Sequence, residues 1–503
     1  MRAATAATLA TLVLAGVSAC GGDSELSGNA RKGGSITVGA GSLPRLLDPA
    51  LATDWLALQA LRAVYTPPLA YRHAEGRDGT DLVPGLAREL PEVSEDGLVY
   101  SFRFRAGLSY SDGTRLRASD FERAVVRARR LDSPYAPLYA AIDAIDADDR
   151  SGRVVVSLTQ PDAAFAHALA LPASAPVPAG TRAADLSSVP PPGIGSYTVA
   201  SIRPGERWVL RRARGFDLSE LPTGNVDQLT FGRFGSPADQ ANRVAIGTTL
   251  DVMQELPPTV QLPEIRSKYA DRYEEQATAS TLFFALEATT TPFDDRRVRQ
   301  AVSLAVDGPT LERLYSGRLE PGCNLLPSSV AGYSRIDPCP YGDRDEPPDL
   351  VRARELVEDA GQVGTVVTVG APRSVAPVAV SRYFIATLRK IGLAARAHPT
   401  GREASVELEL VAPPIAHPSA FLSAFRGRTE DVELDADIAR LLAEPEASAD
   451  DWGEIDERLV EEAYVAPLGS RRQPTFFSER IDVQGCEIFH PVFGTDLAAL
   501  CLR

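Results

Sequence analysis

The sequence predicts an α/β protein with mixed sheets, and three observations support this prediction. Short segments rich in β-branched and aromatic residues alternate apolar and polar side chains, which is typical of half-buried strands. Between them lie segments whose apolar residues recur every three or four positions, as on one face of a helix. The chain of 503 residues is also long enough for two or more lobes with separate cores. Strands that alternate with helices in this way build α/β architectures.

Two strands and a helix are predicted in the first part of the chain. The segment GSITVGAG from Gly34 is rich in β-branched residues and ends in glycine, which indicates a short strand. In the segment 98–114, LVYSFRFRAGLSYSDGT, aromatic and polar residues alternate, which predicts another strand, and the Asp-Gly pair near its end predicts a turn. A helix is predicted from Ser119, where Glu122 three residues later completes a capping box.

A hairpin, a strand and three helices are predicted further along the chain. Residues 190–213 contain two β-rich runs around a Pro-Gly turn, and residues 280–290 (STLFFALEATT) form another strand. The three helices each have one apolar stripe and are predicted within 293–307, 349–361 and 381–392. The first of them begins with two aspartates, which the helix dipole favours, and the other two end at glycines.

The first twenty residues have the order of a secretory signal. Arg2 precedes an apolar run of about a dozen residues, whereas a membrane-spanning helix needs roughly 20, and small residues come just before Cys20. The run Val17-Ser18-Ala19-Cys20 also resembles a bacterial lipobox. That resemblance implies cleavage before Cys20 and a lipid on its sulfur. An ordinary signal followed by a chance cysteine is the alternative.

We therefore predict a lipoprotein signal peptide over residues 1–19 and a flexible tether over residues 20–34. The tether, CGGDSELSGNARKGG, lacks the apolar residues that pack into a core. No later segment is long and apolar enough to span a membrane. The predicted location is the outer face of the cytoplasmic membrane, with the lipid anchor as the contact with the membrane.

Charge and cysteine content restrict the partners. The formal net charge of -15 disfavours nucleic acid, because nucleic-acid binding needs clustered basic surface. With Cys20 assigned to the lipid, four cysteines remain, in two local pairs with short spacings. An extracytoplasmic location permits disulfides, so we predict the bonds Cys323–Cys339 and Cys486–Cys501. Neither pair has CxxC spacing and no histidine is close to the first pair, so no metal site is predicted.

Motifs of catalysis and cofactor binding are absent from the sequence. There is no GxSxG nucleophile elbow, no HExxH and no Walker P-loop. The five histidines are not paired at the spacing of metal ligands, and the acidic pairs are interpreted as helix caps or solvated turns. We therefore predict no cofactor and no enzyme activity. Carboxylates are common in the chain, so a hydrolase stays open as an alternative.

Several segments, in order, resemble one family, the extracytoplasmic solute-binding proteins of peptide/nickel-type ABC importers. The most specific match is residues 82–127, LVPGLARELPEVSEDGLVYSFRFRAGLSYSDGTRLRASDFERAVVR. The other matching segments are SLPRLLDPAL, GIGSYTV, PFDDRRVRQAVSLAVD, ARELVEDAG and LRKIGL. The resemblance extends from about Gly34 to the C-terminus, and six motifs in the family's order make it specific.

The resemblance implies a two-lobed periplasmic-binding-protein-like fold with mixed sheets and a crossing-strand hinge. The ligand of such proteins is enclosed between the lobes. In this chain the first lobe would comprise residues 35–279 and 471–503, with an extra subdomain over about 76–189. The second lobe would comprise residues 280–470.

The chain also departs from the family pattern. Peptide-binding members place an aspartate, which holds the amino terminus of the peptide, where this chain has Pro414 in the run VAPPIAHPSAFL. Another family run, Asn-Pro-x-Tyr-Trp, is replaced by RARGFDLSE at residues 212–220. A nickel ligand is disfavoured because histidines are few, and His417 is interpreted as a surface or packing residue. The departures count against a standard oligopeptide ligand.

The resemblance implies a set of residues that line the cleft: Thr53, Asp54, Trp55, Arg123, Phe283, Phe284 and Pro414. Trp55 suits a ligand site because a rigid ring buries much area at little entropy cost. Asp54 is a candidate for holding a cationic group of the ligand. The alternatives are an ordinary loop carboxylate for Asp54, core packing for Phe283 and Phe284, and a solvated face for Arg123.

The sequence thus predicts a lipid-anchored, monomeric binding protein. It would capture a small solute, a peptide or a peptide-like molecule, and deliver it to the permease subunits of an ABC importer. A secreted hydrolase on a related scaffold and a ligand sensor without a transporter are the alternatives. Opines, sugars and metal chelates stay open as ligands.

Overall fold

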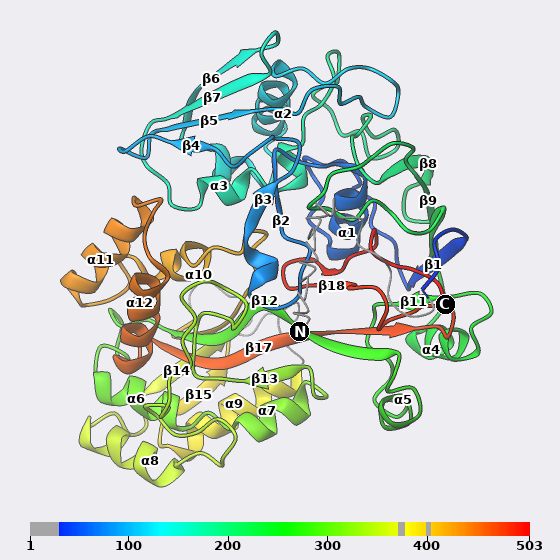
Figure 1. Ribbon diagram of the computed structural model, residues 1–503. Coiled ribbons are helices and arrows are strands. Elements are labelled where there is room, and N and C mark those ends of the chain that lie inside the picture. The colour runs from blue at the N-terminus through cyan, green and yellow to red at the C-terminus, as the bar shows by residue number, and fades with distance from the viewer. Residues whose placement is uncertain (1–29, 371–377, 399–403) are drawn as a thin grey trace, which may run out of the picture.

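The computed structural model describes residues 30–370, 378–398 and 404–503. The predicted signal peptide, Cys20 and residues 20–29 of the predicted tether lie outside the described residues. Within them, one mixed sheet of 11 strands runs through the molecule (Figure 1). Its main row, in spatial order, is β15 (Ala394–Ala397), β14 (Val366–Gly370), β16 (Val406–Val411), β12 (Tyr273–Leu286), β17 (Val465–Phe477), β11 (Val252–Met253), β1 (Ser35–Ala40), β10 (Gln228–Arg233), β9 (Arg207–Arg212) and β8 (Tyr197–Arg203). The remaining strand, β13 (Leu319–Pro321), pairs with β17 beside this row.

Two long antiparallel strands, β12 and β17, connect the two halves of this sheet through the centre of the molecule (Figure 1). The second half of β12 pairs with β16, whereas the end of β17 pairs with β11. The regular register between the two strands is interrupted between Ala277 and Thr281. The predicted lobe boundaries at 279–280 and 470–471 lie at this interruption and stay predictions. Strands that cross between two lobes provide a hinge.

Each half of the sheet has its own hydrophobic core. In the first lobe, α1 (Trp55–Val64) packs on the side of β1 and β10, and a smaller cluster beside β11 holds α4 (Pro237–Ile246) and α5 (Leu262–Lys268). In the second lobe, the core lies between β12, β14 and β16 and the helices α6 (Arg296–Leu304), α7 (Gly308–Leu314), α8 (Leu350–Asp359) and α9 (Val378–Lys390). The structure therefore has the mixed α/β architecture with two lobes that the sequence predicts.

A separate antiparallel sheet forms the predicted subdomain on the first lobe (Figure 1). Its strands, in spatial order, are β4 (Glu92–Val93), β5 (Val99–Arg103), β7 (Arg153–Leu158) and β6 (Ile142–Asp148), and its helices are α2 (Ser119–Arg130) and α3 (Phe165–Ala168). The buried carboxylate of Asp48, in the first lobe, accepts two hydrogen bonds from the buried guanidinium of Arg127 on α2. This ion pair joins the subdomain to the lobe.

Several short elements complete the described fold. They are β2 (Leu69–Tyr71) paired with β3 (Leu82–Pro84), β18 (Phe489–His490) paired with β19 (Gly494–Thr495), α10 (Ser419–Leu422), α11 (Val432–Leu442), α12 (Ala449–Glu461) and single 3-10 turns at 78–80, 136–139, 172–174 and 423–425. None of the helices in the described residues combines the length and the apolar character that crossing a membrane requires.

Aspartates and glycines delimit the predicted helices of the second lobe. The side chains of Asp295 and Asp349 accept hydrogen bonds of 2.9 Å from backbone N–H groups in the first turns of α6 and α8. Gly361 and Gly392 follow α8 and α9 with φ angles of +69° and +105°, a region in which glycine is not strained. These local signals explain why the helices begin and end near the predicted positions.

The predicted capping box at Ser119 is wrong. The N-cap of α2 is Ala118, and no side chain of the helix caps it. Ser119 instead donates from its backbone N–H and its hydroxyl to the Asp149 carboxylate, at 2.9 and 3.1 Å. A carboxylate from the turn between β6 and β7 thus satisfies the start of the helix, and this contact depends on the tertiary fold.

Both predicted disulfides are confirmed. Cys323 is bonded to Cys339 in the loop that follows β13, and Cys486 is bonded to Cys501 at the C-terminus. Each bond closes a short loop, of 16 and 15 residues in sequence separation. In the chain-entropy model, a disulfide that closes a loop of this length stabilises the folded protein by about 3 kcal/mol.

Candidate ligand-binding site at the seam between the lobes

The two lobes touch along a seam, which we define as the contact of the first lobe and its subdomain with the loops 324–336 and 414–418 and helices α11 and α12 of the second lobe. Hydrogen bonds cross it from Ala416 N to Tyr71 Oη at 2.8 Å, from Thr80 Oγ1 to Ser329 O at 2.8 Å, and from Ala163 N to Leu442 O at 3.0 Å. One hydrophobic cluster continues from the subdomain into α11 and α12. The lobes are therefore in direct contact along this seam.

A groove of about 380 Å³ opens at this seam. The first lobe and its subdomain contribute Arg72, Arg77 and His167 to its lining, and the second lobe contributes His417 and Trp452. Because both lobes supply walls, a molecule held there contacts both of them. Such a site is complete when the lobes are closed.

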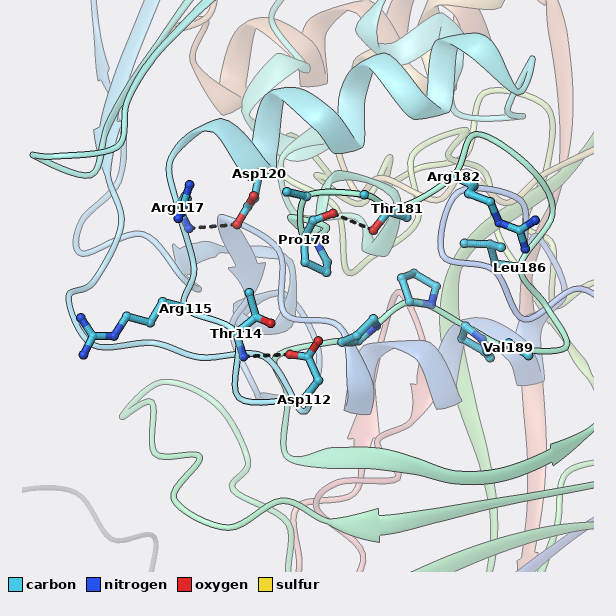
Figure 2. Close-up of a pocket in the computed structure, with 15 residues that line it drawn as sticks. Asp112, Thr114, Arg115, Arg117, Asp120, Pro178, Thr181, Arg182, Leu186 and Val189 are labelled. Atoms are coloured by element: carbon cyan, nitrogen blue, oxygen red, sulfur yellow. Dashed lines mark hydrogen bonds between the residues drawn. The ribbon is translucent and has the colours of Figure 1, made fainter.

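A second pocket, of about 460 Å³, lies elsewhere and is shown in Figure 2. All of its lining residues fall between positions 112 and 192, so the second lobe has no part in it. Several of its polar groups are engaged locally: Thr114 N donates to Asp112 at 2.9 Å, and Arg117 N donates to Asp120 at 2.9 Å (Figure 2). This pocket cannot respond directly to closure of the lobes.

Two histidines face each other across the seam. The rings of His167, on α3, and His417, in the loop before α10, have centroids 5.0 Å apart, and the ring of Trp452 on α12 lies edge-on to His417 at 5.6 Å. Burial lowers the pKa of His167 well below its usual range, and the neighbouring His417 lowers it further. Burial also lowers the pKa of His417 to about 4. Both rings are therefore neutral at pH 7.

Hydrogen bonds engage Nδ1 of both rings. The Tyr71 hydroxyl accepts a hydrogen bond from Ala416 N at 2.8 Å and forms a second hydrogen bond with His167 Nδ1, 3.0 Å away. His417 Nδ1 accepts a hydrogen bond from the backbone N–H of Ser419 at 3.2 Å. A neutral imidazole whose Nδ1 is an acceptor carries its proton on Nε2. His417 therefore carries its proton on Nε2.

The histidine pair makes stability depend on pH. Each ring has a lower pKa in the folded protein than in the unfolded chain, so the unfolded chain binds more protons as pH falls. The stabilisation is present above the unfolded pKa of about 6.5 and is lost as pH falls toward 4. The charged and titratable groups around the pair are Tyr71, Arg72, Arg77, Asp81 and, beyond Tyr71, His490.

We expect the melting temperature of the free protein to fall between pH 7 and pH 5, and to fall less in the double variant His167→Phe/His417→Phe. The variant retains two rings of similar shape that cannot be protonated. Thermal unfolding at pH 7, 6 and 5 measures both slopes. Equal slopes for variant and wild type would show that the pair contributes nothing to the pH dependence.

Further titratable groups lie behind Tyr71 on the first lobe. The Tyr71 ring contacts His490 edge-on, with centroids 6.0 Å apart. His73 Nδ1 lies 3.2 Å from the Asp496 carboxylate, and Arg62 lies 3.9 Å from the same carboxylate. Burial opposes ionisation of Asp496, but Arg62 and His73 outweigh burial and hold its pKa below the usual range. Although histidines gather here, no group of three or more His, Cys, Asp or Glu side chains within the described residues is placed to hold a metal ion.

The predicted residues at positions 53–55 lie at the start of α1. Thr53 and Asp54 are exposed, and the Asp54 carboxylate caps the helix by accepting from Leu56 N at 3.0 Å. Trp55 is half-buried beside Gly494, where an added Cβ would lie 2.6 Å from the indole ring. Its indole N–H is buried and has no hydrogen-bond partner within the described residues. These residues do not line the groove.

The other predicted residues are dispersed. Arg123 is on α2 and pairs with Asp120. Phe283 and Phe284 are fully buried on β12, where Phe283 packs on Phe425 and Phe284 stacks on Phe384 with ring centroids 3.5 Å apart. Core packing, the alternative stated for this pair, describes their position. Pro414 is two residues from Ala416, whose backbone N–H binds across the seam, so its loop is part of the seam.

The sequence did not indicate Tyr71, His167 or Trp452. They come from β2, α3 and α12, and no local pattern connects elements so far apart in the chain. His417 is interpreted from the sequence as a surface or packing residue, and its ring contacts His167 and Trp452. The position of His417 in the loop of Pro414 is the sequence signal that could have indicated a place at the seam.

A two-lobed α/β fold with crossing strands and a groove lined by both lobes defines a class of proteins, the extracytoplasmic solute-binding proteins. Residues 81–429 match the family model described as bacterial extracellular solute-binding proteins, family 5 Middle. The chain belongs to this family, and the family predicted from the sequence motifs is confirmed.

Named relatives and solved structures agree with this assignment. The chain is 29% identical over 342 residues to the glutathione-binding protein GsiB of Escherichia coli O1:K1, a match that covers 65% of this chain and 61% of the relative. The match thus spans about three fifths of that relative's length. A GsiB of Shigella dysenteriae serotype 1 is 28% identical over the same share of each chain.

The structural neighbours cover nearly the whole fold. The clavulanic acid biosynthesis oligopeptide binding protein 2 superposes with a TM-score of 0.81 at 22% identity, over 94% of this chain and 96% of the neighbour. DppA from Helicobacter pylori, in complex with peptide STSA, superposes with a TM-score of 0.71 at 19% identity, over 94% of this chain and 98% of the neighbour. These similarities confirm the predicted two-lobed fold. The relatives and neighbours are named as binding proteins, not as enzymes.

Proposed function

We propose that this chain is a lipid-anchored, extracytoplasmic binding protein that captures a peptide or a related small solute between its lobes. It delivers the solute to the permease subunits of an ABC importer and works as a monomer. The observation that carries the proposal is the groove at the seam, lined by His167 from one side and by His417 and Trp452 from the other. Binding and release require no catalytic group.

The comparisons support a peptide-like solute. GsiB is named for glutathione, and the DppA structure holds a short peptide. The hinge supports capture by closure, because a solute that contacts both lobes favours the closed arrangement by its additional contacts there. A secreted hydrolase is an alternative function of a different class, and a ligand sensor without a transporter is a third possible function. Adjacent genes that encode permeases and ATPases would favour the importer.

The experiment that tests the proposal is a thermal-shift screen followed by small-angle X-ray scattering. The screen contains glutathione, dipeptides, tripeptides, sugars, opines and metal chelates. A compound that binds only the folded form raises the melting temperature. We expect a peptide-like compound to do so, and to lower the radius of gyration. A stabilising compound that leaves the radius unchanged would contradict capture by closure.

The lipid anchor is tested separately at Cys20. We expect Cys20→Ala to release the protein from membranes into the medium, because the lipobox cysteine is the proposed site of the lipid. Fractionation of the expressing cells measures the distribution, and Cys323→Ala serves as a control for the loss of a cysteine as such. An unchanged membrane-bound fraction in Cys20→Ala would contradict the anchor.

A further inference from the structure

Arginines gather around two adjoining pockets of the first lobe and its subdomain. One is the pocket of Figure 2, and the other, of about 580 Å³, lies beside it at the end of β9. The pockets meet along residues 111–114 and 190–195, where Ser111 N donates to Gly193 O at 2.9 Å. Together the linings contain six arginines and three aspartates, in a chain whose formal net charge is -15. Positive charge is therefore concentrated on this side of an acidic protein.

Most of these arginines have no counter-charge in the protein. Five are exposed and form no ion pair within the described residues, and we call them the arginine face: Arg115, Arg117, Arg182, Arg211 and Arg214. The sixth, Arg212, pairs with Asp227 at 2.6 Å. Of the three aspartates, Asp120 is buried, so Asp112 and Asp217 are the exposed carboxylates of the linings. Cations in excess of carboxylates attract an external anion.

An exposed apolar side chain lies among these arginines. Val189 is 76% exposed and precedes three prolines, residues 190–192, that line the same pocket. Figure 2 shows Arg115 and Arg117 on one side of this pocket, and Arg182 with Val189 on the other. A soluble anion offers no apolar surface to a valine, whereas a lipid surface combines phosphate groups with an apolar layer. The combination favours a lipid surface over a free anion.

The described chain begins beside the same pockets. Gly34 N donates to Asp227 Oδ2 at 3.0 Å, and Arg212 binds Oδ1 of this carboxylate at 2.6 Å. Cys20 and residue 30, where the described chain starts, are ten positions apart, which spans at most about 35 Å. Figure 1 shows β1, β8 and β9 at the end of the sheet that is farther from the second lobe. A lipid on Cys20 therefore holds this side of the first lobe near the membrane.

We propose that the arginine face, together with Val189, contacts the anionic phospholipid surface of the membrane to which the chain is anchored. This inference rests on the lipid anchor of the proposed function and specifies which side of the molecule meets the membrane. Guanidinium groups bind phosphate oxygens through paired hydrogen bonds. Because the predicted tether keeps the face near the surface, a contact that is weak in solution is populated in the anchored protein.

Vesicle binding tests this contact in the absence of the lipid anchor. The exported protein, expressed from the full chain with Cys20→Ala, is sedimented with vesicles of phosphatidylcholine, either alone or with phosphatidylglycerol added. At about 0.1 M salt the Debye length is about 10 Å, so local charge outweighs the net charge of the chain. We expect the partition onto the anionic vesicles to be roughly tenfold higher than onto the neutral ones, and to be lost at about 1 M salt.

Charge reversal connects this preference to the arginine face. Arg211→Glu/Arg214→Glu should lower the partition onto anionic vesicles roughly tenfold or more, since each arginine near an anionic surface contributes roughly a fivefold factor. Arg313→Glu/Arg382→Glu is the matched control, because it makes the same change of net charge at exposed arginines of α7 and α9 in the second lobe. The control should keep the partition of the parent protein. Thermal unfolding verifies that both variants are folded.

Two further measurements separate a lipid surface from a free anion. Val189→Ser should lower the partition onto anionic vesicles severalfold, because the apolar contact is lost. Inorganic phosphate alone, titrated into the parent protein in a calorimeter, should show no saturable binding. Parent-like vesicle binding by Val189→Ser would contradict the lipid contact of this residue. Saturable binding of inorganic phosphate that the reversal of Arg211 and Arg214 abolishes would replace the lipid surface by a soluble-anion site.

The outcomes also separate this inference from the proposed function. Equal partition onto neutral and anionic vesicles, or an equal loss in both charge variants, would overturn the membrane contact of the arginine face. Capture of a solute at the seam would still stand, because none of these residues lines the seam groove. A membrane-bound fraction that persists in Cys20→Ala cells and disappears when Arg211→Glu/Arg214→Glu is added would support the arginine face and count against the lipid anchor.

Discussion

Replacement of Asp48 by alanine is expected to destabilise the protein by about 3–5 kcal/mol, the usual cost of breaking a buried ion pair. The Asp48 side chain is fully buried, and its carboxylate also accepts hydrogen bonds from Ala50 N and Leu186 N, each of 2.9 Å. Removing it leaves the Arg127 guanidinium buried without its counter-charge. The change also removes the acceptor of Leu186 N, in the same loop that Arg127 binds through Arg182 O and Ala184 O.

Equilibrium unfolding in denaturant measures this effect. Arg354→Ala is the control, because Arg354 and Glu358 form an exposed ion pair within one helix, and such pairs contribute at most about 0.5 kcal/mol. A loss below about 1 kcal/mol in Asp48→Ala would contradict the role of the pair in joining the subdomain to the first lobe.

The second large effect is expected at Trp55. Trp55→Ala should weaken binding of the tripeptide that the screen identifies by roughly 1–3 kcal/mol, or about 5- to 150-fold in Kd, as loss of an aromatic anchor does. The family resemblance predicts that this residue lies at the mouth of the cleft, outside the lining of the seam groove, and its buried indole N–H lacks a partner within the described residues. The melting temperature of the free protein should change little.

Calorimetric titration and thermal unfolding distinguish the two roles of Trp55. Leu46→Ala, at an exposed apolar residue of the same opening segment, is the control and should change neither quantity. A large loss of stability with unchanged affinity would place Trp55 in the core and remove it from the ligand site. The comparison is informative because Trp55 also packs beside Gly494, so a structural role is the alternative to a role in ligand binding.

Much of the fold could be predicted from local patterns, because the residues that form a strand or cap a helix are close together in the sequence. The alternation around Tyr100 specifies β5, and the aspartates at 295 and 349 cap α6 and α8. The same reasoning failed at Ser119, where Asp149, 30 positions away, satisfies the start of the helix. The crossing of β12 and β17 was inferred from family resemblance, since no local pattern specifies which strands pair.

The candidate site was less predictable, because it exists only after the lobes meet. His167 and His417 are separated by 250 positions, and neither has a sequence neighbour of metal-ligand or catalytic spacing. The family resemblance instead implies Phe283 and Phe284, which are neighbours on β12 and are both buried in cores. The residues that the family resemblance implies and the residues that line the seam groove are therefore different. The two sets come together in the loop of Pro414.

We propose that the chain binds a peptide-like solute and leaves it chemically unchanged. The most direct measurement is equilibrium dialysis of the purified protein against a defined pool of dipeptides, tripeptides and glutathione, with mass spectrometry of the bound and the free fractions after a long incubation. We expect at least one of these compounds to be retained at an equimolar ratio and recovered intact. Retention of none would contradict the claim, and recovery of cleavage products would favour the hydrolase.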